Sequence, residues 1–598
     1  MKKLYTLVLL LLSLRAGAQT GVSVPELAHF DTAIQQFVQR WDVLGASVAL
    51  SRGDKLVYAR AFGYADQART TPLQPHHLMR VASLSKPITA MAIMKLVEEG
   101  RLDLAHRAFG PEGYLSTAYY TEVIDDRRIY DITVQQLLEH SAGWDREKSC
   151  DGFASCDPID FPEHVAQVMN VPNPVGDSTL VRFMLSKGLN FRPGARYAYS
   201  NIGYLVLGKI IEAVTLQPYE AWVRDHLLLP SGVREAHLGR NLLLDKQERE
   251  AEYDSHFQQA SCYGTGETVP AAYGGCNVEA MNAHGGWIFT ARDLTRLLMA
   301  VDGSKGRPGL LSTATIATMV EPSAVNARYA KGWQVNPAGN RWHSGCLDGT
   351  ATYLVRAEKG YTWTILLNTR RDDAAFWTEL DRLGWSCVRR ASRWPAHHLV
   401  GPDQNAAQLT GTPLSKTSAL LRWANGTGNR RLVFMKADSP VDDFPLDGAD
   451  YVADARFGKG QALAGGSFVV ADGEADTVMV KNLDPNRAYF VRVVEYAKSE
   501  TTSHQALYAL EENATMILNE HLAEPNLVAA QTELQLEPNS AYTELALQLV
   551  PTALSNQASY LPNDILPPGS ASPSLEAVGT QPGRTREPGR AVLRLFTK

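Results

Sequence analysis

The side chains best suited to chemistry in this sequence are a serine and a lysine three positions apart, Ser83 and Lys86. If a helix begins at Ser83, the hydroxyl and the amine lie on one face, a turn apart. The positive end of the helix dipole would then favour an alkoxide or an oxyanion beside Ser83. The spacing predicts a nucleophile with its base, although a capping serine followed by a solvated lysine explains the two residues equally well when they are taken alone.

A second candidate group is Tyr199-Ser-Asn201, which precedes an amphipathic helical pattern. A phenol can move a proton, and an amide can orient a substrate carbonyl or accept a hydrogen bond from a lysine. A third group is His343-Ser-Gly345, at the start of a strand pattern. Strand side chains alternate, so His343 and Gly345 should face one side and Cys346 the other. A glycine that faces a cleft lets a substrate backbone approach closely.

Hydrophobic periodicity predicts the elements that position these residues. The stretch 83–99 is apolar nearly all round and ends at Gly100, which is typical of a buried helix with a glycine cap. A hairpin of two strands is predicted at 45–50 and 55–62. Further helices are predicted at 30–38, 132–144 (capped at Thr133 and stopped at Gly143), 205–215 and 372–390, and further strands at 351–356 and 361–367.

The chain has 598 residues, of which 45% are apolar and 20% charged, and a formal net charge of -6. This length predicts about three or four domains. The negative net charge argues against a nucleic-acid-binding protein. The composition is that of an ordinary globular protein.

Residues 1–18 have the order of a secretory signal peptide: two lysines, an apolar run from Leu4 to Leu14, and Ala16-Gly-Ala18. We therefore expect an exported protein, periplasmic or secreted. The apolar run is too short to span a membrane, and no later segment approaches the ~20 apolar residues that a span requires.

Six cysteines lie in the middle of the chain. An even number in an exported protein usually forms disulfides. A zinc site is the alternative, but the spacings match no common ligand pattern. Proximity in the sequence favours the pairs Cys150–Cys156 and Cys262–Cys276, which leaves Cys346–Cys387.

In this order, Ser83-Leu-Ser-Lys86, Tyr199-Ser-Asn201 and His343-Ser-Gly345 resemble the Ser-x-x-Lys, Tyr-x-Asn and Lys-Thr-Gly motifs of a known superfamily. It is the serine β-lactamase and penicillin-binding protein superfamily, in its class C β-lactamase, DD-peptidase and esterase branch. The segments 132–144 and 285–294 are similar to two further family segments. The resemblance covers about residues 25–393.

The resemblance implies an α+β fold, in which an antiparallel sheet flanked by helices stands beside an all-helical lobe. It implies that Ser83 attacks a carbonyl and forms an acyl-enzyme, which water then hydrolyses. Lys86 and Tyr199 would share the acid and base work, and the sequence does not decide which is the general base. Asn201 would hold Lys86 or the substrate amide, and the backbone N–H groups of Ser83 and Cys346 would form the oxyanion hole. This chemistry needs no metal and no cofactor.

His343 departs from the family pattern, because the β-lactamases generally carry a lysine there. A lysine offers a substrate carboxylate a permanent charge, whereas a histidine near its unperturbed pKa is charged only part of the time. A His-x-Gly at this place resembles that of some DD-peptidases, D-amino-acid peptidases and esterases of the branch. The departure weakens a β-lactam-hydrolysing role, and Asn201, His343 and Gly345 are expected to bind the substrate.

The resemblance also bears on one disulfide. The family packs its C-terminal helix on the sheet face away from the cleft, and residues 372–390 fit that helix. Because Cys346 would face the same side, a Cys346–Cys387 bond would join this helix to the active-site strand.

After residue 395 the sequence changes to short alternating runs separated by turns, which is typical of a β-sandwich. The segment 483–489 resembles the fibronectin type III signature, with Tyr489 as its corner tyrosine and Trp423 as its core tryptophan. We therefore predict a hydrolase domain at 19–395, a fibronectin type III-like all-β domain at 403–512, and a low-complexity, largely disordered tail at 513–598.

The expected function is that of an exported serine hydrolase, a D-amino-acid peptidase, DD-carboxypeptidase or carboxylesterase acting on a small acyl or D-amino-acid-containing peptide. The sandwich domain is expected to be a spacer or to contact a cell wall or another surface, and no nucleic-acid partner is expected. One alternative is a class C-like β-lactamase. The other is non-catalytic binding or sensing of cell-wall peptides, which is disfavoured because Ser83, Lys86, Tyr199 and Asn201 are all intact.

Overall fold

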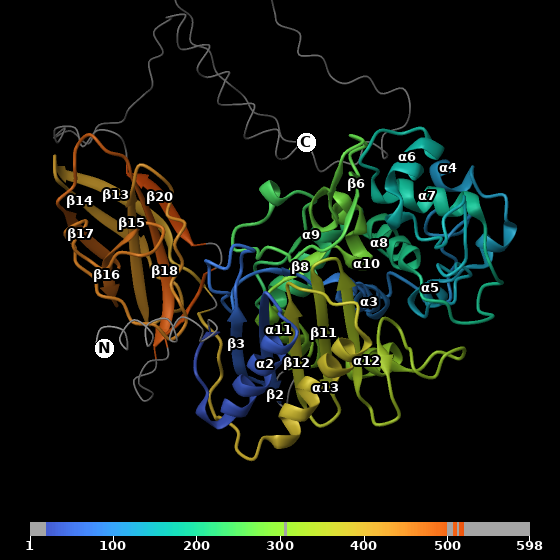
Figure 1. Cartoon of the computed structure of the whole chain (residues 1–598), viewed down its shortest axis with the longest axis horizontal. Helices are drawn as coiled ribbons and strands as arrows, with labels where there is room; N and C mark the ends of the chain where they lie inside the picture. The colour runs from blue at the N-terminus through green and yellow to red at the C-terminus, as the bar shows by residue number, and fades with distance from the viewer. Residues whose placement is uncertain (1–18, 304–307, 403, 499–505, 511–512, 519–598) are drawn as a thin grey trace, which may run out of the picture. The chain divides into compact units, whose positions relative to one another are not determined.

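The computed structural model describes residues 19–303, 308–402, 404–498, 506–510 and 513–518 (Figure 1). The predicted signal peptide, 1–18, and the predicted tail beyond residue 518 lie outside the described residues. Within the described part, no helix is both long enough and apolar enough to cross a bilayer.

A seven-stranded antiparallel sheet organises the described residues between 19 and 390. Its strand order is β1-β3-β2-β12-β11-β10-β9, so the first hairpin of the chain pairs with strands that come some 300 residues later. The strands predicted at 45–50, 55–62, 351–356 and 361–367 all belong to it. In sheet order the strands are β1 (Gln19–Thr20), β3 (Lys55–Gly63), β2 (Gly45–Arg52), β12 (Tyr361–Leu367), β11 (Thr350–Ala357), β10 (Arg341–Leu347) and β9 (Gln334–Val335).

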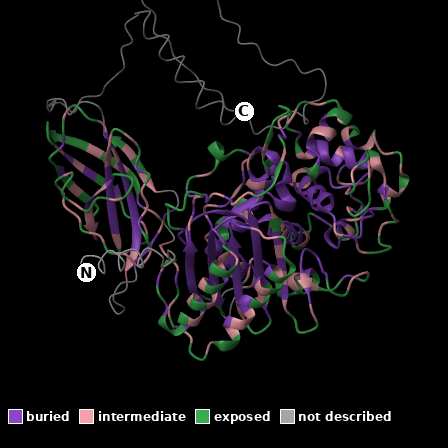
Figure 2. Cartoon of the chain, in the orientation of Figure 1, coloured by how far each residue is buried: buried purple, intermediate pink, exposed green. Residues whose placement is uncertain are grey.

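Helices cover both faces of this sheet, which is buried between them (Figure 2). They are α2 (Ala28–Arg40), α11 (Ala291–Asp302) and α13 (Ala374–Arg390). On one face, Trp385 of α13 meets Trp363 of β12 with ring centroids 4.7 Å apart. On the other, Thr295 Oγ1 of α11 lies 2.8 Å from Thr364 Oγ1 of the same strand. Because adjacent strand residues point in opposite directions, α13 and α11 lie on opposite faces.

A helical lobe completes this part of the chain. Its central helices α3 and α8 are buried over most of their length, as their apolar sequences require. The helices are α3 (Ser85–Glu98), α4 (Ala118–Thr121), α5 (Val134–Leu138), α6 (Pro162–Met169), α7 (Asp177–Lys187), α8 (Asn201–Thr215), α9 (Tyr219–Val223), α10 (Val278–Gly285) and α12 (Thr313–Val320). The predicted α+β architecture of an antiparallel sheet, flanking helices and a helical lobe is confirmed.

Two small sheets lie beside these helices. One joins β4 (Met79–Arg80), β8 (Trp287–Phe289) and β5 (His237–Leu238), and the other is the hairpin of β6 (Gln258–Ala260) and β7 (Thr268–Pro270). The backbone N–H of Val81 bonds to the Trp287 carbonyl, 3.0 Å away. This bond extends the first small sheet to the residue before Ala82–Leu84, the turn that contains Ser83.

Some predicted boundaries were wrong. Ser83 does not begin a helix: it lies in a 3-10 turn (Ala82–Leu84), and α3 begins at Ser85. The predicted cap at Thr133 is confirmed, because its side chain and that of Gln136 form a reciprocal capping box. The helix it begins nevertheless ends at Leu138 instead of running to Gly143.

The described residues after 395 form two antiparallel sheets. One has the order β13-β14-β17, and the other β16-β15-β18-β19 with β20 also paired to β18. The alternating runs of this region, 419–423, 431–436, 467–470, 477–480 and 489–496, each form a strand, and β20 continues the second sheet beyond the predicted boundary at 512. The strands are β13 (Ala407–Ser415), β14 (Ser418–Ala424), β15 (Arg430–Ala437), β16 (Phe468–Gly473), β17 (Thr477–Lys481), β18 (Tyr489–Lys498), β19 (Ala506–Tyr508) and β20 (Ala514–Leu518).

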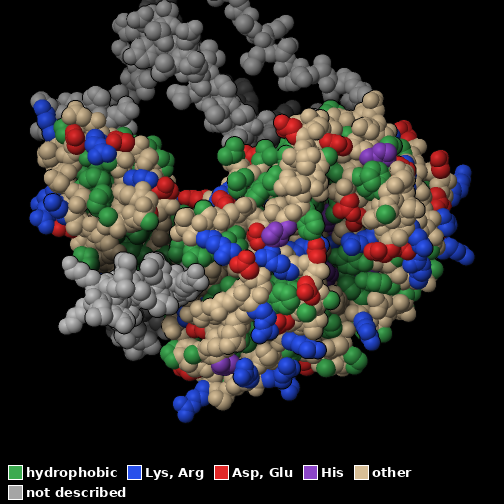
Figure 3. Space-filling view, in the orientation of Figure 1, with side chains coloured by type: hydrophobic (Ala, Val, Ile, Leu, Met, Phe, Trp, Pro, Cys, Tyr) green, Lys and Arg blue, Asp and Glu red, His purple; other side chains and the backbone are tan. Residues whose placement is uncertain are grey.

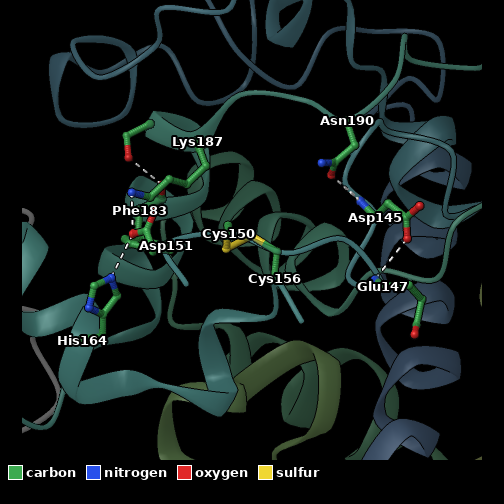
Figure 4. Close-up of a disulfide and its surroundings, with 10 residues drawn as sticks. Asp145, Glu147, Cys150, Asp151, Cys156, His164, Phe183, Lys187 and Asn190 are labelled. Atoms are coloured by element: carbon green, nitrogen blue, oxygen red, sulfur yellow. Dashed lines mark hydrogen bonds and ion pairs between the residues drawn. A yellow bond between two sulfur atoms is a disulfide. The ribbon is translucent and has the colours of Figure 1, made fainter. Parts of the chain in front are cut away.

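The predicted Cys150–Cys156 disulfide is present, with a Cα–Cα distance of 5.2 Å (Figure 4). The other two predicted pairs are wrong, because Cys262, Cys276, Cys346 and Cys387 are free. The thiol of Cys276 lies 3.6 Å from Gln259 Nε2, and Cys262 is buried, with its N–H bonded to the Gly274 carbonyl (2.8 Å).

The error over Cys346 and Cys387 has a geometric cause. Cys346 does lie on the sheet face that α13 covers, since its strand neighbour Ser344 pairs with Tyr353, which bonds to Asp381 of α13. The helix, however, runs the other way. Trp385 of α13 packs on Trp363, which is level with Trp342 at the start of β10. Cys346 lies near the other end of β10. Cys387, two residues beyond Trp385, is therefore farther away still.

Candidate active site

The 3-10 turn that carries Ser83, Ala82–Leu84, is called the nucleophile turn below, and hydrogen bonds hold it from two sides. Thr352 Oγ1 of β11 donates to the Val81 carbonyl (2.9 Å), and Ser85 Oγ donates to the Ala82 carbonyl (2.8 Å). Ala82 has φ +50°, a left-handed conformation that is costly for a residue other than glycine. The surrounding bonds over-determine this conformation, and Ser83, the next residue, presents its hydroxyl to the cleft.

Lys86 lies one turn into the lobe and is buried. Its Nζ is 3.1 Å from Ser83 Oγ and donates to Asn201 Oδ1 and to the His284 carbonyl, each at 2.8 Å. Burial lowers the Lys86 pKa well below its usual value, against the opposing attraction of Asp157. The predicted serine–lysine contact is therefore present, with an amine whose charge is disfavoured.

Tyr199 stands on the loop before α8 and donates its hydroxyl hydrogen to Ser83 Oγ (3.0 Å). Burial raises the pKa of this phenol well above its usual range, so the phenol keeps its proton near neutral pH. Lys86 Nζ lies 4.9 Å from the Tyr199 ring centroid, and the Arg146 guanidinium 5.4 Å from it. Both predicted partners of Ser83 thus meet on one hydroxyl.

Asn201 holds Lys86 on one side and a carboxylate on the other. Its Nδ2 donates to Asp157 Oδ2 (2.7 Å), and Arg146 Nη1 lies 3.8 Å from the same oxygen. Asp157 is only 3% exposed, and burial raises its pKa. Asp157 was not predicted as a site residue, because it follows Cys156 in a loop without periodicity; its place beside a predicted disulfide is the one signal for it in the sequence.

His343 lies at the end of a buried chain of hydrogen bonds. The Ser200 N–H donates to His140 Nδ1 (3.1 Å), His140 Nε2 lies 3.0 Å from the Tyr329 hydroxyl, and that hydroxyl lies 3.2 Å from His343 Nε2. His343 Nδ1 lies 2.7 Å from the Ser344 carbonyl. Because that carbonyl only accepts, Nδ1 carries the hydrogen and Nε2 accepts from Tyr329.

His343 is therefore a neutral imidazole with both ring nitrogens occupied. Burial, with a further contribution from Lys86, lowers its pKa to about 3. It lines the cleft without supplying a positive charge there. The sequence predicted a histidine that is charged part of the time; the structure places it where the charged form is strongly disfavoured.

Gly345 permits a close approach, but to the nucleophile turn. A Cβ at this position would lie 2.5 Å from the Val81 carbonyl oxygen, 2.3 Å from Thr352 Oγ1 and 3.1 Å from Ala82 Cβ. The glycine therefore lets β10 pass directly against the turn that carries Ser83. The oxyanion hole formed by the N–H groups of Ser83 and Cys346 stays a prediction.

The cleft around Ser83 has a volume of about 650 Å³ and carries charges of both signs. The charged residues that line it are Arg146, Arg370, Asp157, Asp160 and Asp348, with His284 and His343 beside them as titratable groups. Burial and the neighbouring Asp157 raise the Asp160 pKa to about 6. On the face seen in Figure 3, basic and acidic side chains are likewise interspersed. Within the described residues, no three His, Cys, Asp or Glu side chains are grouped as metal ligands.

His284 is a further cleft residue that the sequence analysis missed. Its carbonyl accepts from Lys86, its side chain is 2% exposed, and its Nε2 has no hydrogen-bond partner among the described residues. Burial and the nearby Lys86 hold its pKa well below the usual value. The residue lies two positions after Asn282, whose φ is +40°. The sequence signal was its place directly before Gly285-Gly286.

Three comparisons relate this site to known proteins. The sequence profile of the family described as Beta-lactamase matches residues 30–384. Protein flp of Staphylococcus aureus (strain MW2) is 27% identical over 346 residues, which are 57% of this chain and 62% of that protein. The chain therefore spans less than two thirds of the length of flp. Penicillin-binding protein 4* of Bacillus subtilis (strain 168) is 25% identical over 362 residues, 58% of this chain and 73% of that protein.

Among solved structures, the D-amino acid amidase from Ochrobactrum anthropi SV3, complexed with L-phenylalanine amide, aligns with a TM-score of 0.46 and 21% identity. The alignment covers 61% of this chain and 100% of that one. The family profile matches more than half of the chain and includes the Ser83, Lys86 and Tyr199 side chains that meet in the cleft. The chain thus belongs to the beta-lactamase family, within the serine β-lactamase and DD-peptidase superfamily, and carries the residues of a serine acyl-hydrolase.

Proposed function

We propose that the protein is an exported serine hydrolase that forms an acyl-enzyme at Ser83 and acts as a D-amino-acid peptidase, DD-carboxypeptidase or carboxylesterase. One observation carries this proposal. Lys86 Nζ and the Tyr199 hydroxyl approach the same Ser83 Oγ, at 3.1 Å and 3.0 Å. A serine with both a buried amine and a protonated phenol beside it is equipped for nucleophilic attack and for proton return.

The choice of substrate rests on His343. A substrate carboxylate would meet a neutral imidazole there, whose two nitrogens are already bonded to Tyr329 and to the Ser344 carbonyl. This favours amide or ester substrates that need no cation at that position. The alternative is acylation by a β-lactam, which the test includes because one relative is named penicillin-binding protein 4*.

We propose that the two C-terminal sheets form a fibronectin type III-like domain that serves as a spacer or contacts a surface. Two observations support it. Two antiparallel sheets, β13-β14-β17 and β16-β15-β18-β19 with β20 also paired to β18, are what a sandwich of this kind requires. The Tyr489 hydroxyl accepts from the Asp484 N–H (2.7 Å), as a corner tyrosine does, and Trp423 lies in the core. Export rests on the sequence pattern of residues 1–18.

The test compares wild-type protein with Ser83→Ala on three substrates: a D-Ala-D-Ala peptide, a short-chain aryl ester and a chromogenic cephalosporin. We expect turnover of the peptide or the ester, weak or no cephalosporin turnover, and a loss of at least about 1,000-fold in Ser83→Ala, because the nucleophile is gone. A fluorophosphonate and a fluorescent penicillin report acylation directly.

Each result has a clear meaning. Efficient cephalosporin turnover would show a β-lactamase and contradict the substrate assignment. Absence of turnover and of labelling in a folded wild-type protein, or equal labelling of Ser83→Ala, would refute the hydrolase itself and favour a binding or sensing role.

A further inference from the structure

Among the described residues Asp157 has no hydrogen bond to Ser83 or Lys86, but it bonds to the Asn201 amide that holds Lys86. We propose that Asp157 is a positioning residue: it fixes which way the Asn201 amide faces, and through that amide it turns the lone pair of Lys86 Nζ onto the Ser83 hydroxyl. The proposal rests on the serine hydrolase function proposed above and decides which of its residues accepts the first proton.

The first step concerns the amide. An ionised carboxylate can only accept hydrogen bonds, so Asp157 Oδ2, 2.7 Å from Asn201, must face the amide nitrogen. The amide oxygen must then face Lys86, 2.8 Å away. Without Asp157 the two ends of the amide would be nearly equivalent, because nitrogen and oxygen have similar size and the amide can turn over.

The second step concerns the lysine. Two of its three partners, Asn201 Oδ1 and the His284 carbonyl, only accept, while the third, Ser83 Oγ, can also donate. A neutral amine has two hydrogens and one lone pair. Both hydrogens are used by the two carbonyl oxygens, and the lone pair is left for the Ser83 hydrogen. Burial of Lys86 favours this neutral form.

The arrangement gives the proton a path. As Ser83 Oγ bonds to the substrate carbonyl carbon, its proton passes to Lys86 Nζ and the carbonyl π pair moves onto oxygen. The leaving group takes up that proton as its bond to carbon breaks. If the Asn201 amide were reversed, its N–H would claim the lysine lone pair, and Lys86 would point a hydrogen at Ser83 instead. The nucleophile would then have no base.

The fall of kcat/KM at low pH, which is the acid limb of its pH profile, should depend on Asp157. Near neutral pH the charged groups facing Lys86 are Asp157 and Arg146, since the pKa values of His140, His284 and His343 are lowered and that of Tyr199 is raised. Asp160 and Arg146 face Asp157 in turn. The negative charge of Asp157 stabilises the lysine ammonium, and protonation of Asp157 releases the amide. Removing its charge therefore moves the acid limb of kcat/KM to lower pH on both counts.

The experiment compares three variants with wild type on the best ester or peptide substrate from pH 4 to 9. Asp157→Asn should lose roughly 10- to 100-fold in kcat/KM, the factor that a charge-assisted hydrogen bond is worth, with its acid limb at lower pH. The matched control is Glu147→Gln, which removes an exposed carboxylate of the same loop that also pairs with Arg146. This control variant should keep the wild-type kcat/KM at its maximum and the wild-type position of the acid limb.

The third variant exchanges the two groups, Asp157→Asn with Asn201→Asp. Lys86 then faces a carboxylate that can only accept, so its lone pair is again directed at Ser83. We expect recovery of most of the lost kcat/KM, with the acid limb now above that of wild type because the charge lies closer to the lysine. A residue that served only to hold the loop together would produce neither shift.

The outcomes separate the two proposals. Failure of wild type to acylate at Ser83 refutes the hydrolase, whatever Asp157 does. If wild type acylates, a folded Asp157→Asn variant with wild-type kcat/KM and acid limb refutes the positioning role. If that variant does not fold, the exchange variant decides: turnover with a raised limb supports the role, and a folded but inactive exchange variant overturns it.

Discussion

Around Ser83, burial shifts the pKa of both side chains that contact the hydroxyl, Lys86 and Tyr199. The same burial that lowers the Lys86 pKa raises that of Tyr199, so one partner is poised to accept a proton and the other to donate one. Opposite shifts of neighbouring groups assign acid and base roles without any need for extra charges. The site works through position more than through ionised side chains.

Gly345 offers a test of that positioning. Gly345→Ala would place a methyl group within 3 Å of the Val81 carbonyl and the Thr352 hydroxyl, and β10 would have to move away from the nucleophile turn. We expect a loss of roughly 100-fold in kcat, because a misplacement of about 1 Å can cost that much. Steady-state kinetics measures the loss. Gly176→Ala, where a Cβ meets nothing within 4 Å, is the control and should be silent; equal activity of the two variants would contradict this account of β10.

The sequence identified the residues whose chemistry shows in a local pattern and missed those whose role is to hold them. Ser83 and Lys86 share a spacing, and Tyr199 and Asn201 another, so each pair could be found. Asp157 has no such pattern. It reaches Asn201 only because a loop folds across 44 residues of sequence, and long-range contacts of this kind leave no periodic trace.

Among the elements, the Cys150–Cys156 loop carries Asp157 to the cleft. The loop is fastened at several points: Asp151 pairs with His164 (2.9 Å) and Lys187 (2.7 Å), as Figure 4 shows, and the Cys156 N–H bonds to the Arg146 carbonyl (3.0 Å). The disulfide adds a covalent restraint directly beside Asp157. We therefore expect the position of the carboxylate to depend on the oxidation state of this loop.

Removing the disulfide should weaken catalysis without unfolding the protein. In Cys150→Ser with Cys156→Ser we expect kcat/KM to fall, by up to about 100-fold if Asp157 shifts by ~1 Å, while KM changes less. Wild type treated with a thiol reductant should fall to the same level, and the double variant should be insensitive to reductant. If kcat/KM of the double variant equals that of oxidised wild type, the loop does not depend on its disulfide.

Element boundaries show where local pattern stops being sufficient. The hairpin β2–β3 and helix α13 followed from periodicity, and the Thr133 cap from side-chain chemistry. The pairing of β12 with β2 did not, since nothing in either strand specifies a partner so distant in the chain. The direction of α13 across the sheet was equally hidden, and it was this direction that made the Cys346–Cys387 prediction wrong.

At the scale of the whole molecule, buried neutral histidines between residues 76 and 343 should make the folded protein sensitive to acid. Burial lowers the pKa of His77 and His343 to about 3, and those of His76, His140 and His284 lie well below their usual value. The unfolded chain takes up these protons near pH 6.5 and the folded chain does not. The free energy of unfolding is therefore highest above pH 6.5 and falls as the pH drops toward 3. Asp157 and Asp160, whose pKa values are raised, oppose this in part.

Thermal unfolding between pH 7.5 and 4.5 tests this expectation. Below pH 6.5 each buried histidine should cost about 1.4 kcal/mol of unfolding free energy per pH unit, so Tm should fall steeply. His77→Gln should give a shallower fall. His106→Gln, at an exposed position, should keep the wild-type slope. A Tm that does not change over this range would show that the histidines are charged in the folded protein.

The free thiol of Cys346 is exposed on β10, a strand that borders the cleft, but on the sheet face opposite to His343 and Gly345. A small reporter group could therefore be attached to it from solvent, beside the cleft and not inside it. Acylation and deacylation of Ser83 could then be followed with substrates that carry no chromophore at all.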